Sequence, residues 1–498
     1  MIAVLPFLLV SGLTFVEQNV TDDISAGYRQ ADLDRDGSMD LILPSAVYFQ
    51  RNGGFSQGGR VSLPDLRDPQ PVIGQGFPIC DLWTDTLFIL SATTLYRVRW
   101  ESGAWQVLHS QSLTLPRTRE EQPETGSLPE LPHLPPEGQK VALRRFLHDI
   151  NGDGVPEIVM PGEDGLHIYS RNGQDYVEVN RLDVFPAFQV VSGRSPAQVL
   201  WPEAERRPTF PEREVDCSFS FSGNRLAVIS EEPLGDYRVR YRVKHYELDQ
   251  GIALIPEKTR EDLTEPLPGS FRPSLRREDG RIDYAGCERK HSEASIIPRS
   301  ILEPRVTSDG GKTFQGVRAV SCELIDGFAD LDGDGDLDIA VCSSDIFEGG
   351  VRETVARALT ALELTEEVRV YLQDPSGRFP KEPSIVFPFK LKLDAPPAMT
   401  GDLRFLWHTC SLRGDFDGDK HFDLLLARSS DELAVHLFEG NSFSKTPNAV
   451  LAVGGEEEYE IADLDGDGRS DIILTSIDYL QETPTPHARV FLSQEASP

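Results

Sequence analysis

Five short acidic segments with one spacing recur along this 498-residue chain, and an apolar run follows each of them. Each segment carries acidic or amide side chains at positions one, three and five and a carboxylate at position nine. The segments are 32–40, 149–157, 330–338, 415–423 and 463–471. Oxygen ligands at alternate positions suit a hard cation that takes six or more oxygens, which indicates calcium. Because the segment recurs, it marks a structural repeat and not a single site.

The residues after each acidic segment have the pattern of a β-hairpin. An apolar strand comes first, as in Ile339-Ala340-Val341, and a second strand rich in β-branched and aromatic residues follows it. Asn-Gly closes two of these second strands, at Asn52-Gly53 and Asn172-Gly173. The shortest interval, from Asp415 to Asp463, is that of a four-stranded propeller blade.

Two further segments have the same order of strands without the acids. Residues 80–100 and 226–246 each contain two apolar strands in succession. Together with the five acidic units, these two segments give seven predicted blades. We therefore predict an all-β fold, a seven-bladed β-propeller over residues 13–498, with calcium-binding loops in five blades. A closed ring also leaves no long sheet edge unpaired.

Three stretches are expected to be insertions into this ring. Residues 115–138 are rich in Pro and Glu and indicate an exposed loop. Residues 252–316 are charged and interrupted by prolines, which indicates a small subdomain. Residues 350–366 place Val351, Val355, Leu359 and Leu362 at helical spacing, which predicts an amphipathic helix packed on the rim or, alternatively, a helix that binds a partner.

Charge and hydropathy exclude some classes of partner. The chain has 49 basic and 81 acidic residues, a net charge of −32, and phosphate binding needs a basic surface, so nucleic acid is a poor partner. No internal stretch is long and apolar enough to span a membrane. Residues 1–12 contain the apolar run Ile2–Val10 and a small-residue site at Val10-Ser11-Gly12, which fits a signal peptide or a first strand.

Calcium sites of low affinity fill only where calcium is near millimolar, outside the cytosol. We therefore expect a secreted, periplasmic or cell-surface protein, and a monomer. The six cysteines form no CxxC pair, which argues against zinc. Cys322 and Cys342 flank the third acidic segment on segments expected to pair, so a cross-strand disulfide and two buried thiols are both open.

The spacing excludes an EF-hand. That motif closes with an acid at position twelve between two helices, whereas position twelve here is Leu43, Met160, Val341, Leu426 or Leu474. A nine-residue loop between two strands remains. Its candidate ligands are Asp32, Asp34, Asp36 and Asp40; Asp149, Asn151, Asp153 and Glu157; Asp330, Asp332, Asp334 and Asp338; Asp415, Asp417, Asp419 and Asp423; and Asp463, Asp465, Asp467 and Asp471.

Asp330 to Asp338, with Ala329 before it and Ile339-Ala340-Val341 after it, resembles the calcium loop of FG-GAP/VCBS-type repeats. Such repeats form the blades of the integrin α-subunit propeller and of many bacterial secreted proteins. The Phe-Gly and Gly-Ala-Pro signatures are absent, so the bacterial branch fits better. The resemblance implies up to five Ca²⁺ ions bound by the candidate ligands above and by the main-chain carbonyls of Ser38, Val155, Asp336, His421 and Arg469.

Two loops depart from the pattern. Lys420 stands where glycine is expected, and a left-handed backbone there costs a lysine about 1 kcal/mol. We expect this loop to bind calcium most weakly or not at all. Asn151 replaces one carboxylate in the second loop, which should still bind.

Two functions fit this architecture. The first is a calcium-stabilised scaffold for binding or adhesion to a protein or glycan, and the second is a lyase-like enzyme acting on polysaccharides. The chain has no GxSxG, HExxH or phosphate-loop motif, and His148 and His421 fit structural roles beside the loops. Arg238, Arg240, Arg242 and Lys244 form a basic stripe, echoed by Arg97 and Arg99, which is either a solvated strand face or a docking face for an anionic glycan or acidic partner.

Overall fold

The computed structural model describes most of the chain between residues 13 and 495. The exceptions are residues 23, 25–26, 65, 67–77, 92, 114–141, 163–164, 184–218, 236, 251, 277–281, 292–299, 321, 345–350, 395, 397–409, 455–457 and 479–484. The predicted signal segment 1–12 and the predicted loop 115–138 therefore lie outside the described residues.

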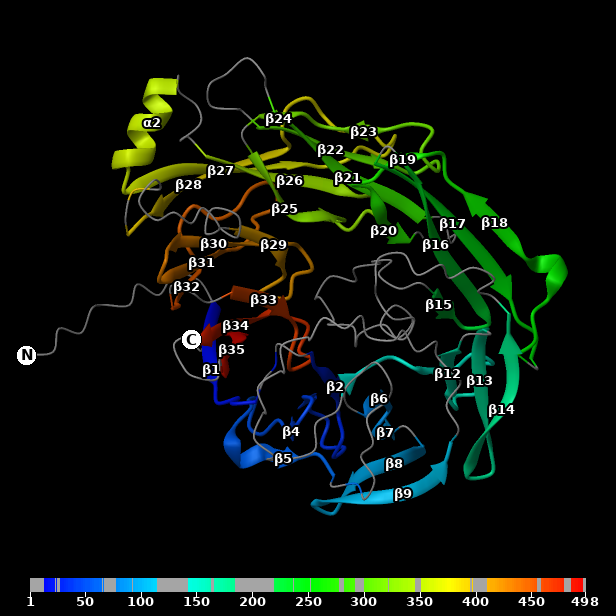
Figure 1. Ribbon diagram of the computed structural model, residues 1–498. Coiled ribbons are helices and arrows are strands. Elements are labelled where there is room, and N and C mark those ends of the chain that lie inside the picture. Colours follow the sequence, from blue (N-terminus) through cyan, green and yellow to red (C-terminus); the bar gives the residue numbers. More distant parts are fainter. Residues whose placement is uncertain are drawn as a thin grey trace, which may run out of the picture.

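The described strands form eight sheets of four or five strands arranged around a common centre (Figure 1). The strands of each sheet follow one another outward from the centre of the ring to its rim. The fold is thus an all-β propeller, and we number its sheets as blades 1 to 8 along the chain.

Blades 1 to 3 occupy the first third of the chain. Blade 1 contains β2 (Arg29–Ala31), β3 (Asp40–Ile42), β4 (Ala46–Tyr48) and β5 (Arg60–Ser62), the last preceded by the 3-10 turn η1 (Gln57–Gly59). Blade 2 contains β6 (Ile79–Trp83), β7 (Thr86–Leu90), β8 (Thr94–Glu101), β9 (Ala104–Ser112) and β10 (Ala142–Leu143). Blade 3 contains β11 (Leu147–His148), β12 (Glu157–Gly162), β13 (Gly165–Asn172) and β14 (Asp175–Leu182).

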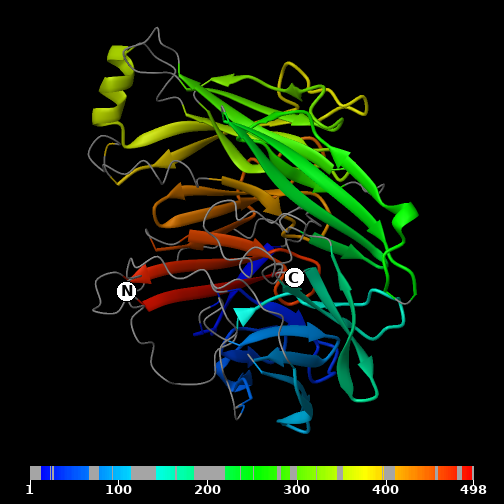
Figure 2. The same ribbon diagram turned by 45° about the vertical axis from the view of Figure 1, so that its right-hand side comes forward.

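Blades 4 and 5 follow along the chain, and the β16–β17 hairpin of blade 4 extends along one side of the ring (Figure 2). Blade 4 contains β15 (Phe219–Ser222), β16 (Arg225–Gly235), β17 (Arg238–Glu247), β18 (Arg260–Leu263) and β19 (Leu267–Pro268), with η2 (Pro256–Lys258). Blade 5 contains β20 (Arg272–Arg276), β21 (Ile282–His291), β22 (Ser300–Thr307), β23 (Gln315–Gly316) and β24 (Ala319–Val320).

Blades 6 to 8 complete the ring. Blade 6 contains β25 (Cys322–Ala329), β26 (Asp338–Ser344), β27 (Glu363–Tyr371) and β28 (Ile385–Lys392), with α2 (Val351–Thr360) between β26 and β27. Blade 7 contains β29 (Cys410–Gly414), β30 (Asp423–Ser429), β31 (Glu432–His436) and β32 (Ala449–Ala452). Blade 8 contains β33 (Glu458–Ala462), β34 (Asp471–Asp478), β35 (Thr485–Glu495) and β1 (Leu13–Gln18).

Blade 8 joins the two ends of the described chain. β1 pairs antiparallel with β35 from Leu13 opposite Glu495 to Gln18 opposite Val490, and the two strands lie side by side in Figure 1. Three strands from one end of the chain and one strand from the other thus make a single blade, so no blade is left with an open seam.

Apolar clusters between neighbouring blades hold the ring together. Leu41 of blade 1 shares a cluster with Ile473 of blade 8, and Leu424 of blade 7 shares one with Val368 of blade 6. Further clusters join each remaining neighbouring pair of blades. Burial of both faces of each sheet explains why the second strands are continuously apolar and do not alternate.

The predicted count of seven blades is wrong. The eighth is blade 5, which lies mostly within the stretch expected to be the 252–316 insertion. Its strands carry Pro273 and Pro304, and its β21 runs into the charged sequence Glu288-Arg289-Lys290. Proline and charge inside a run argue against a strand when the sequence is read alone. Pairing across β21 and β22 nevertheless buries Tyr284 and Val306.

The helix expected within 350–366 forms at Val351–Thr360, and two of its described apolar side chains are largely exposed. Val355 and Leu359 are 44% and 49% exposed, and Leu362 just beyond the helix is 56% exposed. Helical periodicity therefore predicted the helix correctly but did not predict the exposure of these apolar side chains.

Strand register decides the disulfide question. Cys322 lies opposite Ser343, and Cys342 lies opposite Glu323. Because neighbouring positions on a strand point to opposite faces, the two thiols face different apolar clusters and are not joined. Burial raises the pKa of Cys322 to about 11, so this thiol stays protonated at neutral pH. Cys217 lies outside the described residues.

Asp22 fastens the segment between β1 and β2 to blade 1. Its carboxylate accepts hydrogen bonds from Ser45 Oγ (2.7 Å), Tyr48 Oη (2.6 Å) and Arg60 Nε (2.6 Å). Burial alone would raise the pKa of Asp22, but these bonds lower it to about 2. Its ionised form therefore stabilises the fold at neutral pH.

We expect Asp22→Asn to lower the free energy of unfolding by about 1–3 kcal/mol at pH 6. Because the native pKa lies below the unfolded value, this contribution is complete above the unfolded pKa and is lost as the pH falls through about 2. The difference in urea midpoint between wild type and variant should be constant above the unfolded pKa of about 3.8 and should shrink between about pH 4 and pH 2. A constant difference over that range would contradict the assignment.

Candidate metal centres in the acidic loops

Each of the five acidic segments joins the first strand of a blade to its second strand. Position one directly follows the first strand, as Asp330 follows β25, and position nine opens the second, as Asp338 opens β26. The same relation holds in blades 1, 3, 6, 7 and 8. The first strands of these blades have the same orientation in the ring. The acidic loops that follow them therefore lie on the same face of the ring.

Main-chain N–H groups orient the carboxylates within each loop. In the third loop, Asp330 Oδ2 accepts from the Gly335 N–H (2.9 Å), and Asp332 Oδ1 accepts from the Asp334 N–H (3.2 Å). Asp334 Oδ1 accepts in turn from the Asp336 N–H (2.8 Å). Each bond uses one oxygen of its carboxylate, so the side chains are held in place with further acceptor capacity.

The turn requires left-handed backbone at positions four and six. Gly333 and Gly335 have φ of 77° and 91°, and most of the other loops also have glycine at these positions. The exceptions are Lys420 at position six of the fourth loop (φ 70°) and Arg35 at position four of the first loop (φ 63°). The left-handed backbone expected at Lys420 is therefore present. Arg35 also has a left-handed backbone, which the sequence did not predict.

The acid at position nine ties its loop to the third strand of the blade. Asp423 Oδ2 accepts from the Phe416 N–H (2.8 Å), and Oδ1 accepts from the Phe438 N–H (2.8 Å). The equivalent pairs of bonds are present at Asp40, Asp338 and Asp471. These acids are almost fully buried, so they are structural elements of the blade whether or not they also hold a cation.

Four of the five loops bring three carboxylates close enough to share one cation. The candidate ligand atoms lie within 4.8 Å of one another in the trios Asp32–Asp34–Asp36, Asp330–Asp332–Asp338, Asp415–Asp417–Asp423 and Asp463–Asp465–Asp471. In the second loop Asn151 replaces a carboxylate, and its amide donates to Glu157 Oε1 (3.0 Å).

The donor set fits calcium. Asp330 Oδ1 is a buried oxygen without a hydrogen-bond partner. A buried anionic oxygen without a partner is costly, and a hard cation would satisfy it. The sets contain only oxygen ligands on flexible loops, as calcium prefers.

Burial raises the pKa of the closing acids, to about 7 at Asp40 and about 8 at Asp338 and Asp423. Main-chain hydrogen bonds lower these pKa values, and the neighbouring aspartates raise them. Burial and the neighbouring Asp467 likewise raise the pKa of Asp465 to about 6. A positive charge placed beside these carboxyls would lower their pKa values again.

Neighbouring loops contact one another. Asp415 N–H donates to Ser470 Oγ (2.8 Å), which links the fourth loop to the fifth. A Cβ on Gly466 would lie 2.4 Å from Met39 Cγ, so the fifth loop packs closely against the first. Glycine at position four therefore also permits close packing between blades.

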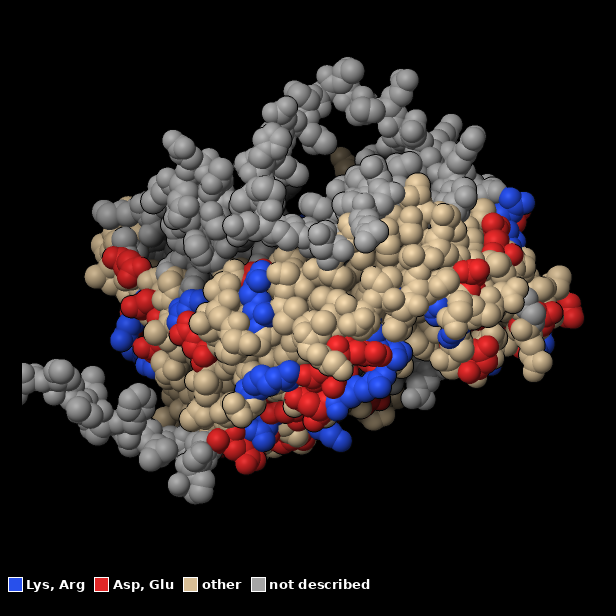
Figure 3. All heavy atoms as spheres, turned by 90° about the horizontal axis from the view of Figure 1, so that it is seen from below, with Lys and Arg blue, Asp and Glu red and all other residues tan. Residues whose placement is uncertain are grey.

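The basic stripe on β17 alternates with buried residues and is paired with acids of its own blade. Val239, Tyr241 and Val243 are buried. Arg240 Nη1 lies 3.5 Å from Glu232, Arg242 Nε lies 3.4 Å from Glu261, and Lys244 Nζ lies 3.9 Å from Glu261. Basic and acidic side chains also lie next to one another on the face shown in Figure 3. This pairing favours a solvated strand face.

We expect the double variant Arg240→Glu/Arg242→Glu to lower stability by less than about 1 kcal/mol, because exposed ion pairs contribute little. Thermal unfolding measures this effect. The docking-face interpretation would gain support if the double variant, still folded, lost retention on an immobilised acidic polysaccharide that retains the wild type.

The other predicted basic and histidine residues have structural contacts. Arg97 Nη2 donates to the Gln174 carbonyl (2.8 Å), and Arg99 Nε lies 3.3 Å from Asp85. His148 is buried against Phe221, and burial lowers its pKa to about 3. His421 Nδ1 lies 3.2 Å from Asp419.

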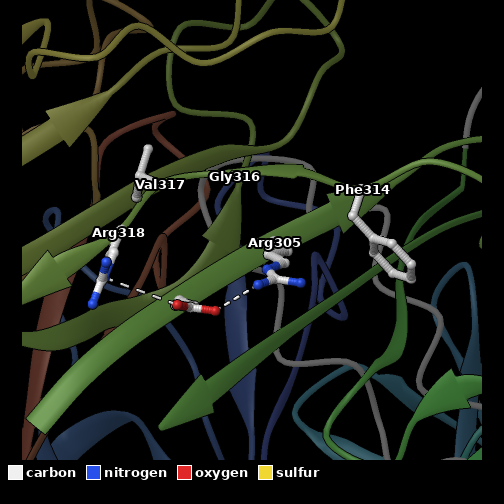
Figure 4. Close-up of a pocket in the computed structure, with 6 residues that line it drawn as sticks. Arg305, Phe314, Gly316, Val317 and Arg318 are labelled. Atoms are coloured by element: carbon white, nitrogen blue, oxygen red, sulfur yellow. Dashed lines mark hydrogen bonds and ion pairs between the residues drawn. The ribbon is translucent and has the colours of Figure 1, made fainter. Parts of the chain in front are cut away.

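A shallow pocket lies on blade 5, lined by Glu303, Arg305, Phe314, Gly316, Val317 and Arg318 (Figure 4). Its volume is about 260 Å³. Glu303 lies between the two arginines, 2.5 Å from Arg305 Nη2 and 4.0 Å from Arg318 Nε, and it also contacts Lys290 Nζ (2.6 Å). The carboxylate thus offsets much of the positive charge that an anionic ligand would need.

The fold and the repeated loops define a β-propeller protein with acidic loops between its first and second strands. Residues 415–474, which span the fourth and fifth loops, match the family model for the FG-GAP-like repeat. This part of the β-propeller ring therefore carries the FG-GAP-like repeat. No curated protein matches the chain in sequence. In the described residues no helix is long and apolar enough to cross a membrane.

Similarities to solved structures are distant. A Synechocystis apocarotenoid oxygenase is 9% identical, with 81% of this chain and 87% of that chain covered and a TM-score of 0.24. A Trypanosoma rangeli sialidase in complex with sialic acid is 10% identical, with 94% and 59% covered and a TM-score of 0.24. Bacteroides ovatus xyloglucan PUL GH43B is 9% identical, with 96% and 98% covered and a TM-score of 0.21. These similarities carry no argument about function.

Proposed function

We propose that this protein is a calcium-stabilised β-propeller that acts outside the cytosol as a binding or adhesion scaffold for a protein or glycan. The observation that supports it most is the recurrence of one oxygen-rich loop at the same joint in five blades. A single acidic turn is common on protein surfaces, whereas the same turn at equivalent joints indicates a shared role.

In each loop the carboxylates at positions one, three, five and nine and the position-seven carbonyl would hold the ion. The calcium would supply positive charge among side chains that otherwise repel one another. The loop residues then fasten the first strand of a blade to its second, as Asp338 already does through Leu331 N–H (2.8 Å) and Gln373 N–H (2.8 Å). Such a site stabilises the fold and does not serve as a catalytic centre.

A ring held together by weak calcium sites functions only where calcium is near millimolar. This requirement supports a secreted, periplasmic or cell-surface location. Binding specificity of such a ring would come from the loops and faces of its blades, since the shared fold supports many different functions.

A screen against acidic polysaccharides, in calcium and in EDTA, distinguishes a binding scaffold from an enzyme that acts on polysaccharides. We expect calcium-dependent retention of the protein on an immobilised glycan or protein partner, with no new product in solution. Release of unsaturated oligosaccharides would contradict the scaffold function and would show that the protein is a lyase.

A further inference from the structure

The first acidic loop is distinguished by one arginine that engages two of its carboxylates; in the fifth loop, by comparison, Arg469 Nε lies 3.9 Å from Asp467. Arg51 Nη1 donates to Asp36 Oδ2 (2.9 Å), and Arg51 Nη2 donates to Asp34 Oδ2. Asp34 and Asp36 are the side chains at positions three and five, so the guanidinium engages two of the four carboxylates that a calcium ion would need.

Contacts outside the loop hold Arg51 in this position. Its Nη1 also donates to the Gln50 carbonyl (2.8 Å), and its guanidinium carbon lies 5.3 Å from the centre of the Phe49 ring. Asp34 is only 14% exposed in this pair. Arg51 and Asp36 are 44% and 40% exposed, so only the Asp34 side of the ion pair is shielded from water.

Hydrogen bonds identify the equivalent residue in the other blades. In blade 1, the Gln50 N–H donates to the closing acid Asp40, and Arg51 follows it. The residues in the same relation to their closing acids in blades 6, 7 and 8 are Gln373, Phe438 and Ser493. The residues that follow these are Asp374, Glu439 and Gln494. None of the three carries a positive charge, so blades 6, 7 and 8 have no arginine at this position.

Blade 3 offers a matched comparison. Arg171 opens an Arg-Asn-Gly turn with the same sequence as Arg51-Asn52-Gly53. Its Nε donates to the Gly173 carbonyl (3.0 Å) and its Nη2 donates to Gln174 Oε1 (3.3 Å), so it makes these bonds to its own turn. The difference between the two loops thus lies in where the guanidinium is directed.

We propose that Arg51 takes the place of the cation in the first loop, so that this loop is closed without calcium while the other four depend on it. This inference rests on the proposed calcium function for the other loops. It also makes the first loop, and not the Lys420 loop, the weakest calcium site. Blade 1, which packs against both blade 8 and blade 2, would then stay closed when calcium is removed.

The test counts calcium ions bound per chain. Wild type, Arg51→Gln and Arg171→Gln are stripped with EDTA and dialysed against radioactive calcium at about 1 mM, a concentration typical of extracellular sites. Arg51→Gln should bind one more ion per chain than the wild type, and Arg171→Gln should bind the same number as the wild type. Circular dichroism checks that each variant is folded, and Arg51→Met replaces Arg51→Gln if the latter is not.

Equal numbers of ions in Arg51→Gln and wild type would overturn the inference, whether that number is zero or larger. A gain in Arg171→Gln equal to that in Arg51→Gln would also overturn it. If wild type binds no calcium while Arg51→Gln binds one ion, the role of Arg51 stands and the proposed calcium function of the other loops fails.

Discussion

Removal of calcium with EDTA is expected to lower the thermal midpoint of the protein by roughly 5 °C. A site held at ten times its dissociation constant contributes about 1.4 kcal/mol, so four such sites contribute about 6 kcal/mol. The entropy of unfolding of a chain of 498 residues is about 1 kcal/mol per degree. Dividing the lost stability of about 6 kcal/mol by this entropy gives the expected shift of the midpoint.

Magnesium is the matched control for this melt. It demands near-octahedral geometry and keeps several waters, so an excess of magnesium in place of calcium should restore little of the midpoint. Full restoration of the thermal midpoint by calcium, but not by magnesium, would support loops that are specific for calcium. A midpoint that is the same with calcium and with EDTA would contradict a structural role for the ion.

Replacement of a closing acid is expected to have the largest effect of any single substitution in the loops. Asp423→Ala leaves the buried N–H groups of Phe416 and Phe438 without an acceptor. Each such group costs about 1–3 kcal/mol, so the variant should lose about 2–6 kcal/mol of unfolding free energy. This loss should persist in EDTA, because the hydrogen bonds belong to the blade itself.

Asp419→Asn in the same loop separates the two roles of the carboxylates. Asp419 is 43% exposed, and the amide oxygen of Asn can still accept from the His421 N–H. Its effect should therefore appear only in calcium and should be small in EDTA. Equal losses for Asp419→Asn and Asp423→Ala in EDTA would show that position nine has no special structural role.

The sequence allowed the acidic loops and their strands to be predicted because both depend on local patterns. Asp330 to Asp338 and the apolar residues after it specify a turn and a buried strand wherever they occur. The eighth blade could not be found in this way, since Pro304 in β22 and the charges of β21 hide its strands. Long-range pairing between β21 and β22 outweighed these local signals.

The features that distinguish one loop from another were also beyond a reading of the sequence. Arg51 and Arg171 are both followed by Asn-Gly, and only tertiary structure shows that one is directed into a loop and the other into its own turn. Similarly, a difference of one residue in register placed Cys322 and Cys342 on opposite faces of one sheet.

The number of calcium ions retained by the wild-type chain tests the central claim most directly. Protein is dialysed to equilibrium against buffer with about 1 mM calcium, and the bound metal is measured as the excess over the buffer against protein concentration. We predict four ions per chain, one for each acidic loop except the one that Arg51 contacts. A chain that retains no calcium under these conditions, and whose midpoint does not depend on the ion, would contradict the account.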